Sequence, residues 1–115
     1  MSLAPIYALE ARQGDTFRLN LEYKDEDSNP IDLTGCLVEF GLAPAPGGKP
    51  IFQYFSPEFV TVDGPAGELT IEVPSEDTKR WSQRRLHYEV TLTFTDDSVL
   101  TLLEGRLSIR PEIVA

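Results

Sequence analysis

Few residues in this 115-residue sequence are of types that take part directly in chemistry, because it contains one histidine and one cysteine. Cys36 lies in the run Gly35-Cys36-Leu37-Val38, without a cationic neighbour that would activate its thiolate. We therefore interpret Cys36 as a small buried hydrophobic residue. His87 lies out of phase with the apolar positions of the strand that it enters, so we expect it on the solvent side. The sequence thus predicts neither an enzyme nor a cofactor.

An acidic run, Asp25-Glu26-Asp27-Ser28-Asn29, is the best candidate for a metal site. It places oxygen atoms at the first, third and fifth positions, as the calcium loop of an EF-hand does. The sixth position is Pro30 in place of the required glycine, and the twelfth is Cys36 in place of a bidentate glutamate. We therefore interpret the run as a solvated acidic turn and predict no metal site.

Alternating apolar and polar residues indicate the elements that must position every other group. Tyr88, Val90, Leu92 and Phe94 occupy every second position, which is the period of a half-buried strand. Similar runs, separated by turns rich in proline and glycine, recur at residues 7–12, 17–23, 36–42, 51–55, 58–62, 69–73 and 99–109. Gly105 predicts a bulge in the last run. Residues 75–81 suggest the single helical turn, with Ser75 as N-cap and Trp81 folded over one end of the core.

These elements predict an all-β fold, a single antiparallel β-sandwich with an immunoglobulin-like outline. We expect about seven strands and one short helical turn near residues 75–81. The predicted organisation is a flexible terminus at 1–6, one sandwich domain at 7–110 and a C-terminal tail at 111–115.

The composition limits the classes of partner. Hydrophobic residues make up 41% and charged residues 25% of the sequence, as in ordinary globular domains, and the net charge is −9. A net negative charge repels phosphate backbones and anionic lipid surfaces, so we expect neither nucleic acid nor membrane as a partner. The apolar runs are far shorter than the roughly 20 residues that cross a bilayer, and no basic start precedes an apolar block. We therefore expect no membrane span and no signal peptide.

An interaction edge is predicted near residues 51–62. Aromatic residues crowd into this segment, and strict alternation would bury only about half of them. The break at Ser56-Pro57 confines the segment to a sheet edge or a bulged strand. A group of arginines at 80–85 would meet acidic groups across the contact. The predicted interface residues are Phe52, Tyr54, Phe55, Phe59, Arg80, Arg84 and Arg85.

Several phrases of the sequence together resemble small structural proteins of tailed phages and prophages. The similarity is to the N-terminal β-sandwich module of the upper-baseplate protein family, which attaches receptor-binding parts to a phage tail. The phrases that carry it are Gly14-Asp15-Thr16-Phe17, the run 27–35 (DSNPIDLTG), Gly67-Glu68-Leu69-Thr70-Ile71, Glu76-Asp77-Thr78, Tyr88-Glu89-Val90, the run 103–109 (LEGRLSI) and Pro111-Glu112. One departure is Arg84-Arg85-Leu86, where such proteins often have a glycine.

This resemblance implies a non-enzymatic virion structural or assembly module of the tail, baseplate or neck. It implies docking to other virion proteins or to a second copy of the chain, first in the host cytoplasm and then in the virion. The alternative is an immunoglobulin-like ligand-binding module that takes a glycan or calcium. An enzyme ranks last, because no nucleophile, base and orienting group occur together.

Overall fold

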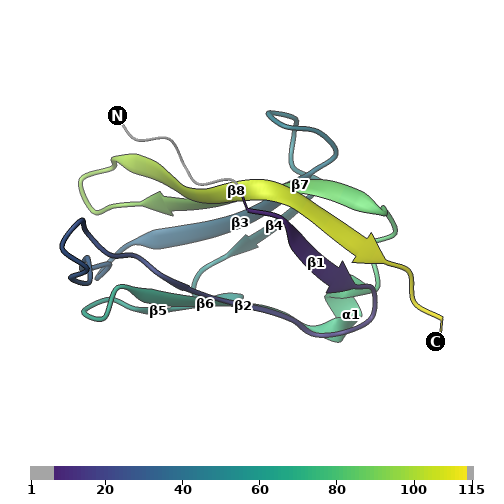
Figure 1. Ribbon diagram of the computed structural model, residues 1–115, viewed down its shortest axis with the longest axis horizontal. Helices are drawn as coiled ribbons and strands as arrows, with labels where there is room; N and C mark the ends of the chain where they lie inside the picture. Colours follow the sequence, from purple (N-terminus) through teal and green to yellow (C-terminus); the bar gives the residue numbers. More distant parts are fainter. Residues whose placement is uncertain (1–6, 114–115) are drawn as a thin grey trace.

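The computed structural model describes residues 7–113 and contains two β-sheets packed face to face (Figure 1). The predicted terminus at 1–6 and the last two residues of the predicted tail at 111–115 lie outside the described residues. Within residues 7–113 the chain forms eight strands and one four-residue helix. The predicted all-β sandwich is therefore confirmed.

The larger sheet has five strands in the order β1-β8-β7-β3-β4. Their bounds are β1, Leu9–Arg12; β8, Val99–Arg110; β7, Arg85–Thr93; β3, Leu37–Ala43; and β4, Phe52–Phe55. Neighbouring strands are antiparallel except β1, which runs parallel to the second half of β8. One pair of strands thus departs from the purely antiparallel arrangement that we predicted.

The smaller sheet has three antiparallel strands in the order β2-β6-β5. Their bounds are β2, Phe17–Glu22; β6, Glu68–Val73; and β5, Val60–Asp63. Residues 51–62, predicted as an edge, supply the edge strands of both sheets, because the chain crosses from β4 to β5 at Ser56-Pro57. The predicted single edge is therefore two edges on different sheets.

The core lies between the sheets and follows the alternation of the sequence. Tyr88, Val90 and Leu92 are buried on β7, as predicted, and Phe94, just past the strand, is half-buried. On β3, Val38, Phe40 and Leu42 are likewise buried. Period-two burial therefore places one face of each central strand in the core.

Aromatic rings fill one end of this core. Trp81 is fully buried, and its ring contacts those of Phe17 and Tyr54 edge-on, with centroids 5.6 and 6.2 Å apart. Its indole N–H donates a hydrogen bond of 2.9 Å to the Tyr54 hydroxyl. Phe40 stacks against Phe17 at 5.6 Å. The predicted inward packing of Trp81 is confirmed.

The helix α1 (Ser75–Thr78) is shorter than predicted and has a different cap. Pro74 is the N-cap residue, and its carbonyl accepts hydrogen bonds from the N–H groups of Asp77 and Thr78. Ser75 is therefore the first helical residue, and the prediction that it caps the helix is wrong. The Thr78 hydroxyl lies 2.8 Å from the Asp15 carbonyl and 3.0 Å from the Gly14 N–H, which fixes α1 to the β1–β2 turn.

The bulge predicted at Gly105 lies elsewhere. The pairing of β7 with β8 shifts register between Val90 and Thr91, opposite Leu102, whereas Gly105 pairs regularly with Tyr88. Gly105 has a different role. A side chain there would collide with the Tyr7 carbonyl, so glycine allows the chain before β1 to approach β8.

No helix in the described part of the chain is long and apolar enough to cross a membrane.

Candidate functional site

The outer faces of the two sheets differ in chemistry. Every outward position of the three-stranded sheet is polar or charged. Arg18 forms a salt bridge with Glu72, and the Thr70 hydroxyl donates a 2.8 Å hydrogen bond to Asn20 Oδ1. These cross-strand pairs satisfy charges and hydrogen-bonding groups of this surface within the sheet itself. This sheet therefore presents an ordinary solvated face.

The outer face of the five-stranded sheet carries exposed apolar side chains instead. Leu37, Phe55 and Val99 are 63, 50 and 64% exposed, and we call these three residues the apolar patch. Leu37 and Val99 both lie in register with Thr93, so they share a row across β3, β7 and β8. Phe55 lies in the next row, opposite Glu39. Exposed large side chains gathered on one sheet face mark an interaction surface more strongly than scattered ones do.

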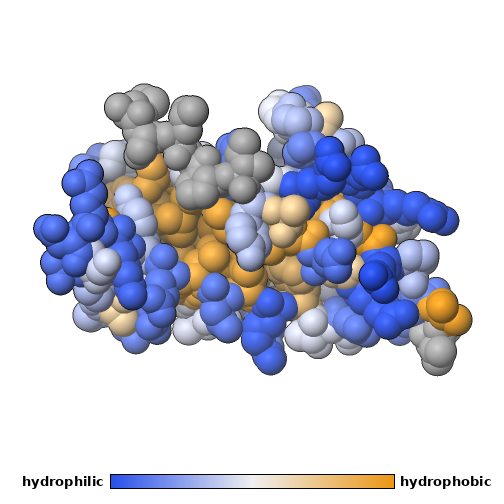
Figure 2. All heavy atoms as spheres, viewed as in Figure 1, coloured by the Kyte–Doolittle hydropathy of each residue, from blue (hydrophilic) through white to orange (hydrophobic). Residues whose placement is uncertain are grey.

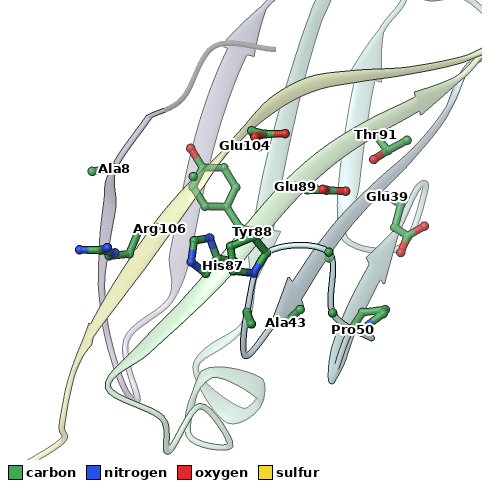
Figure 3. A pocket seen from close by; sticks show the side chains of 16 residues that line it. Ala8, Glu39, Ala43, Pro50, His87, Tyr88, Glu89, Thr91, Glu104 and Arg106 are labelled. Atoms are coloured by element: carbon green, nitrogen blue, oxygen red, sulfur yellow. The ribbon is translucent and has the colours of Figure 1, made fainter. Parts of the chain in front are cut away.

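A groove of about 730 Å³ occupies the rest of this face (Figure 3). Small residues on β3, Gly41 and Ala43, leave space beneath the β3–β4 loop, and that loop supplies a wall from Ala45 to Pro50. Figure 1 shows the same loop standing away from the sheet. The polar residues that line the groove are Glu39, His87, Glu89, Thr91, Glu104 and Arg106, from β3, β7 and β8.

The electrostatics of the groove favour a cationic group in the bound partner. Glu89 and Glu104 lie directly opposite each other on β7 and β8, and like charges in such a pair repel. Within residues 7–113 neither carboxylate forms a salt bridge. Glu39 accepts a 3.0 Å hydrogen bond from Gln53. A positive side chain between Glu89 and Glu104 would offset their repulsion.

Hydrogen bonds of Tyr88 and Tyr7 fix the chain before β1 at one side of the groove. The Tyr88 hydroxyl donates a 2.6 Å hydrogen bond to the Tyr7 carbonyl, and the Tyr7 N–H donates to the Glu104 carbonyl at 2.8 Å. Burial, with a smaller contribution from the charges of Tyr7 and Glu104, raises the pKa of Tyr88 to about 12. The hydroxyl therefore stays protonated, and remains a donor, throughout the physiological pH range.

The four aromatic residues that we predicted at an interface differ in their burial in the structure. Tyr54 is only 5% exposed and belongs to the core, so the prediction that it lies on an interaction surface is wrong. Phe59 is half-buried and packs edge-on against Tyr54 at 4.9 Å. Phe52 is half-buried beneath Arg80, whose guanidinium carbon lies 5.5 Å from the ring centroid. Phe55 alone among the four is exposed.

The three predicted arginines lie away from the aromatic segment, except for the Arg80–Phe52 contact. Arg80 also pairs with Asp77 at 3.8 Å across the end of α1. Arg84 and Arg85 are exposed at the start of β7, at the end of the sandwich where α1 lies (Figure 1). The structure therefore joins Arg80 to Phe52, and Arg84 and Arg85 lie at the same end of the sandwich as Arg80.

Sequence reasoning missed the groove, although it placed His87 correctly on the face opposite Tyr88. His87 is half-buried, because the β3–β4 loop forms the wall beside it. The available signal was Gly41 and Ala43 at outward positions of β3, where a strand normally carries larger side chains.

The other candidate residues have structural contacts. Cys36 is a free, buried thiol, as predicted, and burial, with a smaller effect from Asp32, raises its pKa. The Asp25 carboxylate accepts 2.9 Å hydrogen bonds from the N–H groups of Asp27 and Asn29 and so closes the acidic turn. The described residues contain no group of three or more potential ligands that could hold a metal ion.

No known protein-family model matches this chain, and comparison with curated proteins finds no significant match.

Proposed function

We propose that this chain is a protein–protein docking module that binds through the outer face of its five-stranded sheet. The observation that carries the proposal is the contrast between the two outer faces. One is covered by locally satisfied polar pairs, whereas the other combines the apolar patch with a groove. An apolar patch beside a polar recess is the usual composition of an interface with a hydrophobic centre and a polar rim.

The groove adds selectivity to this surface. The facing carboxylates of Glu89 and Glu104 favour a partner that presents a lysine or arginine there. The depth beneath the β3–β4 loop suits an inserted side chain or an extended segment. We therefore expect the partner to bring both an apolar contact and a basic group.

The biological setting that we propose is a phage or prophage virion, in which the module joins tail, baseplate or neck components. Support comes from the sequence phrases that resemble upper-baseplate modules and from a sandwich fold suited to assembly by surface docking. Tail, portal or capsid genes beside the gene for this chain would support this setting. A position inside a metabolic operon would contradict it.

A double variant tests the docking face. Leu37→Asp combined with Phe55→Asp adds two charges to exposed positions and should weaken binding to a co-expressed product of a neighbouring gene by at least about tenfold, because the patch would have to bury them. The control, Asn20→Asp with Thr61→Asp, adds the same charge to the opposite face. Copurification and titration calorimetry measure both. Equal loss of binding in both double variants, or no loss of binding in either, would refute the assigned face.

A further inference from the structure

The two ends of the sandwich carry opposite charge. The molecule extends 44 Å along its long axis against 25 and 24 Å across it, and the β2–β3, β5–β6 and β7–β8 connections lie together at one end (Figure 1). Figure 2 shows hydrophilic side chains at both ends of the view and apolar ones between them. The sign of the charge at each end follows from the sequence and the topology.

One end is acidic. It consists of the β2–β3 loop, the β5–β6 turn and the β7–β8 turn, together with the strand residues that lead into them. Among residues 7–113 the one base at this end is Lys24, and the acidic residues are Glu22, Asp25, Glu26, Asp27, Asp32, Asp63, Glu68, Asp96 and Asp97. Hydrogen bonds from Thr34 and Ser98 lower the pKa values of Asp32 and Asp96, so both stay ionised at neutral pH.

The opposite end is basic, although the whole chain carries a net charge of −9. It consists of the ends of β1 and β8, the residues after α1 and the start of β7. Among residues 7–113 its bases are Arg12, Lys79, Arg80, Arg84, Arg85 and Arg110, and its acids are Glu10, Asp15, Glu76, Asp77 and Glu112. All six bases are exposed, and within residues 7–113 Arg80 is the one among them that forms a salt bridge.

We propose that copies of this chain associate head to tail, with the basic end of one copy against the acidic end of the next. This inference goes beyond the proposed docking function, because it uses the ends of the sandwich and leaves the five-stranded face free. Such a contact joins two different surfaces, so it generates rings or filaments in place of closed dimers.

Charge complementarity identifies a second copy as the occupant of each end. At physiological salt the Debye length is about 8 Å, which is much shorter than the 44 Å molecule. Repulsion between the net charges of two copies is then largely screened, whereas charges in direct contact at the ends still attract. The 25 by 24 Å cross-section allows at most about 600 Å² of end-on contact on each copy, which is in the size range of weak specific contacts.

Reciprocal charge reversal tests the proposal by sedimentation velocity at 50 to 500 µM protein, roughly the range where weak contacts of this size assemble. The wild type should form species larger than dimers in 0.1 M salt and dissociate in 1 M salt. Arg84→Glu with Arg85→Glu, and separately Glu26→Lys with Asp27→Lys, should each be monomeric. An equimolar mixture of these two variants should associate again, because each supplies the end that the other lacks.

The control is Asn20→Asp with Thr61→Asp, which also makes the chain more negative but does so in the middle of the three-stranded sheet, where both residues are in register with Thr70. It should associate like the wild type, and thermal melts should show that all variants fold. Phe55→Asp alone, at a position opposite Glu39 within the sheet, should also still associate, which separates this proposal from the docking face. A monomeric wild type, association that stops at a dimer, or a mixture that stays monomeric would overturn head-to-tail assembly.

Discussion

Replacing Trp81 by alanine should lower the free energy of unfolding by about 3–5 kcal/mol, the usual cost of removing a fully buried tryptophan. The indole packs against Phe17 and Tyr54, and its N–H is satisfied by the Tyr54 hydroxyl. Removal leaves a cavity between the sheets at the end where α1 closes the core. Urea titration followed by circular dichroism measures the change.

Tyr54→Phe separates the hydrogen bond from the packing. It keeps the ring but leaves the buried indole N–H without an acceptor, so it should cost about 1–3 kcal/mol, less than the alanine substitution. A Trp81→Ala variant with the wild-type urea midpoint would mean that the tryptophan does not fill the core.

Two glycine substitutions should have clearly different effects, although both glycines have φ in the left-handed region, +64° for Gly67 and +71° for Gly47. Alanine at either position costs about 1–2 kcal/mol of backbone strain. A Cβ at Gly67 would also lie 2.7 Å from the carbonyl oxygens of Tyr23 and Ile31, whereas a Cβ at Gly47 would meet nothing within 4 Å.

Gly67→Ala should therefore be less stable than Gly47→Ala by a further 1–3 kcal/mol or so, the typical cost of overpacking. The substitution would also disturb the 2.7 Å hydrogen bond from the Tyr23 N–H to the Gly67 carbonyl, which joins the start of the β2–β3 loop to the β5–β6 turn. Equal thermal midpoints for the two variants would show that this close approach is absent in solution.

The inward face of each strand could be predicted from the sequence because burial follows a local period of two. Val38, Phe40 and Leu42 illustrate this, since each is buried where alternation placed it. The inward face of residues 51–62 was harder to predict, because the chain crosses from one sheet to the other at Ser56-Pro57 and the alternation of buried and exposed residues starts again there. Tyr54 is consequently a core residue, whereas its neighbour Phe55 is exposed.

The candidate surfaces depend on which strands are neighbours, and that information is not local. Glu89 and Glu104 face each other only because β8 pairs with β7 in a register shifted at Leu102. Arg12 and Arg85 lie 73 residues apart in sequence, yet β1 and β7 flank β8 and bring both to the same end. The group of arginines at 80–85 is visible in the sequence, but its position at the end opposite the acidic turns depends on the order of the strands.

The most direct test of the docking function is hydroxyl-radical footprinting of the chain, free and within its complex with a partner. Leu37, Phe55 and Val99 are at least half exposed in the free chain, and Ile113, at 86%, lies beyond the sheet and serves as an internal control. Binding through the five-stranded face should protect the three residues of the apolar patch severalfold and leave Ile113 unchanged, since a buried interface core excludes water. Unchanged reactivity at all three residues in a verified complex would contradict docking through this face.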